Sequence, residues 1–234
     1  MTNPDLESNY TDIVNYKGIW LPAREKEIPK WCELNKYIVD GKPAYQYNKL
    51  ETALQTKYVK QFRTCIDVGA HVGTWAMHLC KRFKMVECFE PVELHRKCFK
   101  MNMQHLQNWT LHDHACSDRI VKGRMEKAGK VIANFQEGEQ SEMLFPVTAY
   151  PLDDYNFQNV DFIKIDVEGY ELKVIYGALQ TIEKWKPCII VEQKNYANYG
   201  YSGPFCGKIL KRMGAKYREC LHGDYIYSWD LGVQ

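Results

Sequence analysis

Hydrophobic and polar positions follow two alternating patterns through the larger part of the chain. Short apolar runs typical of buried strands occupy residues 64–68, 85–89, 109–115, 160–167 and 187–192. Between the runs, apolar residues recur three and four positions apart, which predicts helices over about 74–83, 92–106, 171–183 and 204–213. Strands that alternate with helices predict a parallel sheet with helices on both faces. The pattern therefore indicates a doubly wound α/β domain.

Two segments depart from this alternation. Residues 215–220 and 224–229 flank the pair His222-Gly223, which is typical of a hairpin, so we expect an antiparallel pair that closes the sheet. Residues 117–150 contain three glycines among many charges. We expect strand pieces and a loop there, as an elaboration of the core.

Residues 1–60 differ in composition from the rest and are rich in Tyr, Trp, Asn and Lys. Within them, residues 45–59 have the apolar spacing of a helix. We therefore divide the chain into an N-terminal extension, 1–60, and a main domain, 61–234. The extension either folds over the site as a lid that faces the substrate or packs as an extra layer, through aromatic residues at Tyr10, Tyr16, Trp20, Trp31, Tyr37, Tyr45 and Tyr47.

Charge and cysteine content limit the class of protein. The 31 Lys and Arg nearly balance the 29 Asp and Glu, which argues against a strong nucleic-acid or membrane-surface binder. No apolar run approaches the roughly 18 residues of a transmembrane helix, and the first ten residues lack signal-peptide features. Nine scattered cysteines without a C-x-x-C pair predict reduced, structural thiols, no zinc and a cytoplasmic location.

The first candidate site follows the first strand of the main domain. Gly69 and Gly73 allow a sharp turn and close approach to a ligand, just before a helix begins. Glu90 ends the next strand, 23 residues after Asp67, where a carboxylate can accept hydrogen bonds from both ribose hydroxyls. Helix capping is the alternative role for Glu90. Together the loop and the acid predict a nucleoside cofactor.

A second acidic group follows the strand at 160–167. Asp166 and Glu168 share a sheet face if the strand persists, with Glu171 one turn further on. Carboxylates are costly to cluster unless they bind something. The alternative is that Glu168 and Glu171 stabilise a helix N-terminus. Glu192 and a histidine could complete an oxygen-rich metal site, but no ligand spacing supports it, so we predict no metal.

At these residues the chain resembles FkbM-type S-adenosylmethionine-dependent methyltransferases of the class I fold. The matching stretches span about 63–192 and are IDVGAHVGTWA (66–76), CFEPV (88–92), HACSD (114–118), PLDDY (151–155) and DFIKIDVEGYELKVIYGA (161–178). The resemblance implies a mostly parallel, Rossmann-like sheet of seven strands and S-adenosylmethionine as cofactor. His71 departs from the family pattern, which more often has a small polar residue such as Asn there.

The resemblance also implies the roles of individual residues. The cofactor is expected to contact Asp67, Gly69, Ala70, His71, Gly73 and Glu90, with Ala115 and Cys116 beside its adenine. Asp166 and Glu168 are expected to face the sulfonium and the acceptor. The candidate general bases are Asp166, Glu168 and His71, and His71 could instead bind the cofactor's carboxylate.

The predicted reaction is methyl transfer to a hydroxyl of a sugar or another small molecule, in which the protein mainly aligns donor and acceptor. One alternative is an RNA or cap methyltransferase, for which positive charge is available at Lys57, Lys60, Arg63, Lys81, Arg82 and Lys84. The other is a nucleoside-binding protein that has lost the reaction. The sequence leaves the acceptor and the oligomeric state open.

Overall fold

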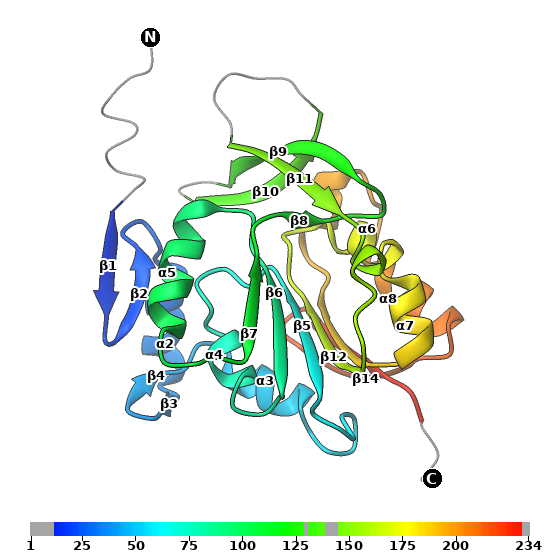
Figure 1. Cartoon of the computed structure of the whole chain (residues 1–234), viewed down its shortest axis with the longest axis horizontal. Helices are drawn as coiled ribbons and strands as arrows, with labels where there is room; N and C mark the ends of the chain where they lie inside the picture. Colours follow the sequence, from blue (N-terminus) through cyan, green and yellow to red (C-terminus); the bar gives the residue numbers. More distant parts are fainter. Residues whose placement is uncertain (1–11, 129–130, 139–144, 231–234) are drawn as a thin grey trace.

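The computed structural model describes residues 12–128, 131–138 and 145–230. Its centre is a seven-stranded sheet in the order β14-β15-β13-β12-β5-β6-β7 (Figure 1). The strands are β5 (Thr64–Val68), β6 (Met85–Phe89), β7 (Trp109–His112), β12 (Val160–Ile165), β13 (Cys188–Glu192), β14 (Lys216–Leu221) and β15 (Asp224–Ser228). All neighbours are parallel except β15, which is antiparallel to both β13 and β14. The predicted doubly wound, mostly parallel sheet of seven strands is confirmed.

Helices cover both faces of this sheet, and each face has its own core (Figure 1). One face carries α3 (Tyr47–Ala53), α4 (Ala76–Leu79) and α5 (Glu93–Met103), and the other carries α6 (Glu171–Tyr176), α7 (Leu179–Trp185) and α8 (Cys206–Arg212). The division follows from strand geometry, because successive side chains point to opposite faces. Cys65 and Phe162 thus face the first group of helices, whereas Ile66 and Ile163 face the second.

Several elements are shorter than predicted. The helices expected at 45–59 and 74–83 are reduced to α3 and α4. The helix expected over 171–183 is broken into α6 and α7 at Gly177. A Cβ atom at Gly177 would lie 1.8 Å from the carbonyl oxygen of Ser117. The break therefore lies where another backbone segment approaches the chain too closely for any side chain.

The strand predicted at 160–167 was too long, and the predicted placement of the two acidic residues on one face of that strand was wrong. β12 ends at Ile165, and Glu168 has a left-handed backbone with φ +58°. Asp166 and Glu168 therefore lie in the loop after the strand and do not share a face of a continuous strand. The strand expected at 109–115 is likewise divided, into β7 and the separate β8 (Ala115–Cys116).

A second, smaller sheet lies above the carboxyl ends of the central strands (Figure 1). Its order is β10-β9-β11-β8, with β9 (Val121–Ala128), β10 (Val131–Glu137) and β11 (Phe145–Tyr150). The strand pieces predicted within 117–150 are confirmed, and residues 129–130 and 139–144 of that segment lie outside the described ranges. The small sheet covers the end of the central sheet where parallel α/β domains bind ligands.

The N-terminal extension packs as a layer against the main domain beside α5 (Figure 1). Its elements are β1 (Ile13–Tyr16), β2 (Ile19–Pro22), α2 (Glu27–Asn35), β3 (Ile38–Val39), β4 (Lys42–Pro43) and α3; residues 1–11, Tyr10 among them, lie outside the described ranges. Asn102 of α5 exchanges hydrogen bonds with the backbone of Trp20 at 2.8 and 2.9 Å. It also donates to the carbonyl of Val72, at 2.8 Å. The extension is thus tied to the glycine loop as well as to α5.

All nine cysteines are free, and eight of them are buried, as expected of structural thiols. Within residues 12–128, 131–138 and 145–230, no helix has the length and apolar character needed to cross a membrane.

Candidate functional site

One cavity of about 230 Å³ lies at the carboxyl ends of β5, β6 and β12. Three parts of the chain enclose it: the loops that follow these strands, the small sheet, and the N-terminal extension. The loops contribute Gly69, Ala70, His71, Glu90, Asp166 and Glu168, the small sheet contributes Ala115, Cys116, Met125 and Phe135, and the extension contributes Glu25, Glu27, Ile28, Tyr45 and Gln46.

The glycine loop is bound tightly to two neighbouring strands. The amides of Gly69 and Ala70 both donate to the carbonyl of Phe89 at 3.0 Å, which fixes the loop to the end of β6. Gly69 has φ +81°, and a Cβ atom there would lie 1.9 Å from the carbonyl oxygen of Asp166. Only glycine fits both the backbone conformation and this approach. The loop therefore presents backbone, rather than side chains, to this part of the cavity.

Glu90 is held in place by the backbone around it. It is 5 % exposed, and its two carboxylate oxygens accept hydrogen bonds from the amides of His71 (2.9 Å) and Val92 (2.8 Å). The ring of His95 lies 3.3 Å from one of the same oxygens. A carboxylate has about four acceptor positions, so with three of them used Glu90 keeps about one for a further donor. Glu90 is thus fixed in direction at the cavity, and its contact with a ribose stays a prediction.

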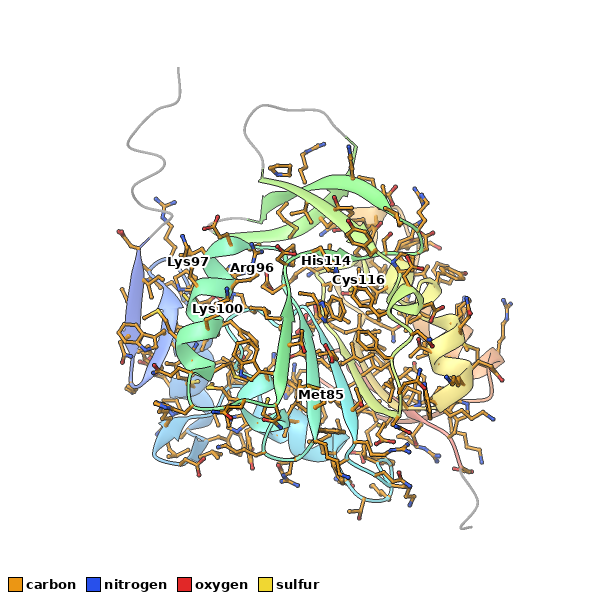
Figure 2. The ribbon with its side chains drawn as sticks, in the orientation of Figure 1. Met85, Arg96, Lys97, Lys100, His114 and Cys116 are labelled. Atoms are coloured by element: carbon orange, nitrogen blue, oxygen red, sulfur yellow. The ribbon has the colours of Figure 1, made fainter. Side chains whose placement is uncertain are left out.

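The end of the cavity beneath the small sheet is mostly apolar. It is lined by Phe89, Ala115, Cys116, Met125 and Phe135, with His114 at its edge. Figure 2 shows His114 and Cys116 next to each other beneath that sheet. Burial lowers the pKa of His114, so its imidazole is neutral at neutral pH. This end suits a planar, uncharged ring.

Asp67 and Lys164 form a buried ion pair below the glycine loop. Asp67 is fully buried, and its Oδ1 lies 3.1 Å from the ammonium of Lys164 on the adjacent strand. The same ammonium donates to the carbonyl of Gly69 at 3.1 Å and lies 4.0 Å from Asp166. Burial raises the pKa of Asp67, and the carboxylates of Asp67 and Asp166 outweigh the effect of burial on Lys164 and raise its pKa as well. Lys164 therefore stays protonated and connects the pair to the cavity.

His71 lies between the main domain and the extension. Its Nε2 is 3.7 Å from Glu25, and its ring packs edge-on against His95 with centroids 4.2 Å apart. Burial, followed by the charges of His95 and Lys164, holds the pKa of His71 well below its usual value. The imidazole is therefore neutral at neutral pH, despite the nearby carboxylate.

The loop after β12 is held in a strained conformation by its own side chains. Glu168 has φ +58°, which is uncommon for a residue with a side chain, and it accepts a hydrogen bond from Asn195 at 2.6 Å. Glu171 accepts hydrogen bonds from the amides of Val167 (3.2 Å) and Gly169 (2.9 Å) and does not line the cavity. Glu171 thus lies in the first turn of α6 and braces the loop before it, and no side chain among the described residues caps this helix by a hydrogen bond. Burial, followed by the charge of Asp166, raises the pKa of Glu168 above its usual value.

A cluster of carboxylates continues from Asp166 away from the cavity. Oxygens of Asp166, Glu192 and Asp224 lie within 4.8 Å of one another. Lys194 pairs with Glu192, and Lys49 of α3 pairs with Asp224. Burial, followed by the charge of Asp166, raises the pKa of Glu192 to about 8. The sequence grouped Asp166 and Glu192 with Glu168 and a histidine, whereas the structure groups them with Asp224. Lys194 and Lys49 supply countercharge to this cluster.

The structure brings most of the predicted site residues to one cavity. Asp67 and Gly73 are the exceptions, because neither lines it. Asp67 lies below the cavity and pairs with Lys164, which lines it. Gly73 has φ +85°, and a Cβ atom there would lie 2.9 Å from Phe99. Sequence reasoning gave no role to Lys164, although it lies within the 161–178 motif, and it missed Glu25 and Gln46 of the extension, which no motif marks.

The charge of the cavity is strongly negative. Among the residues that the structure describes, five carboxylates line it against the ammonium of Lys164, which gives a formal charge of −4 when histidines are counted as uncharged. The carboxylates are Glu25, Glu27, Glu90, Asp166 and Glu168. Such a lining favours a ligand that carries positive charge.

A second hollow, of about 570 Å³, opens between α5 and β7 and shares His114 with the cavity. Arg96, Lys97 and Lys100 lie along α5 on its border (Figure 2). Lys97 pairs with Glu93 at 2.8 Å, and Arg96 donates to the carbonyls of Glu90 (3.1 Å) and Pro91 (2.5 Å). Arg96 therefore supports the turn that carries Glu90.

The chain is similar to solved methyltransferase structures at low identity. The FkbM methyltransferase of Methylobacillus flagellatus is 17% identical, with a TM-score of 0.51 over 72% of this chain and 44% of that one, so this chain spans less than half of that protein. The N-methyltransferase NodS of Bradyrhizobium japonicum, solved with S-adenosyl-l-homocysteine, is 10% identical over 97% of both chains, with a TM-score of 0.47. A precorrin-6y C5,15-methyltransferase of Geobacter metallireducens is 11% identical over 92% of this chain and 100% of that one, with a TM-score of 0.46. No curated protein matches the chain significantly.

The model of the methyltransferase FkbM domain matches residues 67–222, more than half of the 234 residues. The match includes the glycine loop, Glu90 and the Asp166–Glu168 loop, and it begins after the extension. The chain therefore belongs to the FkbM methyltransferase family.

Proposed function

We propose that the protein transfers a methyl group from S-adenosylmethionine to a hydroxyl of a small molecule, carbohydrates included. The observation that carries the proposal is the cavity, with its apolar lining beneath the small sheet, Glu90 after β6 and a carboxylate-rich part that includes the loop after β12. The strand order β12-β5-β6-β7 places Glu90 between the other two parts, and the described lining has a formal charge of −4. This arrangement suits an adenine ring, a ribose and a sulfonium cation in that order. Loss of the sulfonium charge on methyl transfer would weaken binding of the product and aid its release.

Glu168 is the general base that the geometry favours. It lines the cavity, its strained backbone and Asn195 fix its direction, and its raised pKa brings its basicity closer to neutrality than that of an exposed glutamate. Asp166 stays a second candidate, because it also lines the cavity beside Lys164. The neutral imidazole of His71 is the third.

A small-molecule acceptor is favoured over RNA by the pairing of surface charge. Four of the six basic residues considered for RNA binding form ion pairs with carboxylates: Lys57 with Glu219, Arg63 with Asp161, Lys81 with Asp40 and Arg82 with Glu51. Methyl-labelled donor incubated with a panel of sugars, other hydroxyl compounds and RNA tests this choice. We also propose a reducing, cytoplasmic location, which the buried free thiols support.

We predict that Glu90→Gln weakens binding of S-adenosylhomocysteine by roughly 10- to 100-fold, since hydrogen bonds to a charged group contribute about 1.5–3 kcal/mol. Isothermal titration calorimetry measures the loss. The matched control is Glu87→Gln on β6, the strand that precedes Glu90; Glu87 pairs with His112 at 2.9 Å and does not line the cavity. Equal affinities of the two variants would contradict a ribose contact at Glu90.

We predict that Glu168→Gln lowers kcat by about 10²–10⁴-fold and leaves product affinity unchanged. In the unsubstituted enzyme, kcat/KM should rise with pH through the pKa of Glu168, which lies above the ordinary 4.5, because the base must be deprotonated. His71→Gln should retain this acid limb, since the limb belongs to Glu168. If the limb survives in Glu168→Gln and disappears in Asp166→Asn, the base is Asp166.

A further inference from the structure

The extension places one carboxylate against the glycine loop. Glu25 is 7 % exposed, and its Oε1 accepts hydrogen bonds from the amides of Glu27 (2.6 Å) and Ile28 (3.0 Å) at the start of α2. Its Oε2 lies 3.7 Å from the imidazole of His71. Since that imidazole is neutral, it does not balance the charge of Glu25. The carboxylate is therefore fixed in direction at the cavity wall.

The neighbours of Glu25 make this wall rigid. Trp75 donates to Gln46 at 3.0 Å, and Gln46 donates to the hydroxyl of Tyr45 at 3.0 Å. Burial, followed by the charges of Asp166 and Glu25, raises the pKa of Tyr45. Tyr45 therefore lies within electrostatic reach of both carboxylates. The extension and the Asp166 loop form adjoining walls beside the glycine loop.

The order of features along the cavity leaves one end for the amino-acid part of the donor. With adenine at the apolar end and ribose at Glu90, the remaining part extends toward the glycine loop and the extension. That part carries an α-ammonium group, which needs a carboxylate partner in a site this enclosed. Lys164 already lies beside Asp166, and Glu168 is bound by Asn195. Glu27 is exposed at the rim.

We propose that Glu25 binds the α-ammonium group of the donor, so that the N-terminal extension completes the donor site. The inference rests on the proposed function, because it takes S-adenosylmethionine as the donor. It assigns a binding residue outside residues 67–222, where the family match lies.

The experiment compares S-adenosylhomocysteine with its analogue in which hydrogen replaces the α-amino group. Calorimetry on the full-length protein and on Glu25→Gln gives four affinities. Removing the amino group should weaken binding to the unsubstituted protein about tenfold or more, and it should have almost no effect in Glu25→Gln. Gln can still accept the two amide hydrogen bonds of α2, so the fold is preserved. Glu33→Gln, an exposed position of the same helix, is the matched control and should behave as the unsubstituted protein.

The outcomes separate this inference from the proposed function. If the unsubstituted protein binds S-adenosylhomocysteine but the amino group has the same effect with and without Glu25, the assignment of Glu25 is wrong and the proposed function stands. If the unsubstituted protein binds neither compound, both proposals fail.

Discussion

Gly69→Ala is expected to abolish donor binding and to lower the free energy of unfolding by roughly 3 kcal/mol or more. The new Cβ atom would lie 1.9 Å from the carbonyl oxygen of Asp166, which is backbone and cannot rotate away. The amide of Asp166 donates to Val68 at 3.1 Å, so relief of the clash would separate β12 from β5 at the site. Urea denaturation measures the stability, and calorimetry with S-adenosylhomocysteine measures the binding.

Gly41→Ala is the matched control for this substitution. Gly41 has φ +75°, close to the +81° of Gly69, but nothing lies within 4 Å of the added Cβ atom. The Gly41→Ala variant carries the backbone strain without the close contact. We expect it to lower the free energy of unfolding by about 1 kcal/mol and to leave binding of S-adenosylhomocysteine unchanged. Similar losses in both variants would mean that strain, rather than the contact with Asp166, makes glycine necessary at position 69.

Lys164→Met is expected to lower the free energy of unfolding by about 3–5 kcal/mol, because it leaves the carboxylate of Asp67 buried without a countercharge. Asp67 is fully buried and Lys164 is 5 % exposed, so water cannot replace the lost ammonium. The contact to the carbonyl of Gly69 is lost as well. Denaturant unfolding at neutral pH measures the loss.

The double variant Asp67→Asn, Lys164→Met provides the control, and we expect it to recover most of the stability. The pH dependence gives an independent test. The folded-state pKa of Asp67 is raised, and removal of Lys164 should raise it further. The loss of stability in Lys164→Met therefore develops as pH rises above 3.8, the pKa of Asp67 in the unfolded chain. The deficit of the single variant should therefore shrink as pH falls. A deficit independent of pH would mean that lost packing, not buried charge, is responsible.

The sequence predicted the main sheet well because buried strands and amphipathic helices have strong periodicities. The boundaries it missed depend on contacts between distant segments. Gly177 breaks a helix because the backbone of Ser117 passes beside it, and no local pattern reports that. The short strands of the extension were also missed, since two to four residues are too few to establish a period.

The candidate site was predictable where a motif follows a strand end. Glu90 and Asp166 were located in this way, and both line the cavity. Glu25 and Lys49 come from the extension, and each acquires its role only through a partner far along the chain, such as Asp224 for Lys49. Pairing across 175 residues leaves no trace in a single sequence.

The shared packing of Ile19, Leu21 and Ile28 with Val72 has a practical consequence for the choice of protein fragments. A fragment that begins at residue 67, where the family match starts, would expose Val72 and Cys98 to water and lack one wall of the binding pocket. Fragments chosen by the family boundary should therefore aggregate or lose ligand, even with the glycine loop, Glu90 and the Asp166–Glu168 loop present. Conversely, substitutions in the N-terminal extension can alter which ligand binds while the sequence of the glycine loop stays the same.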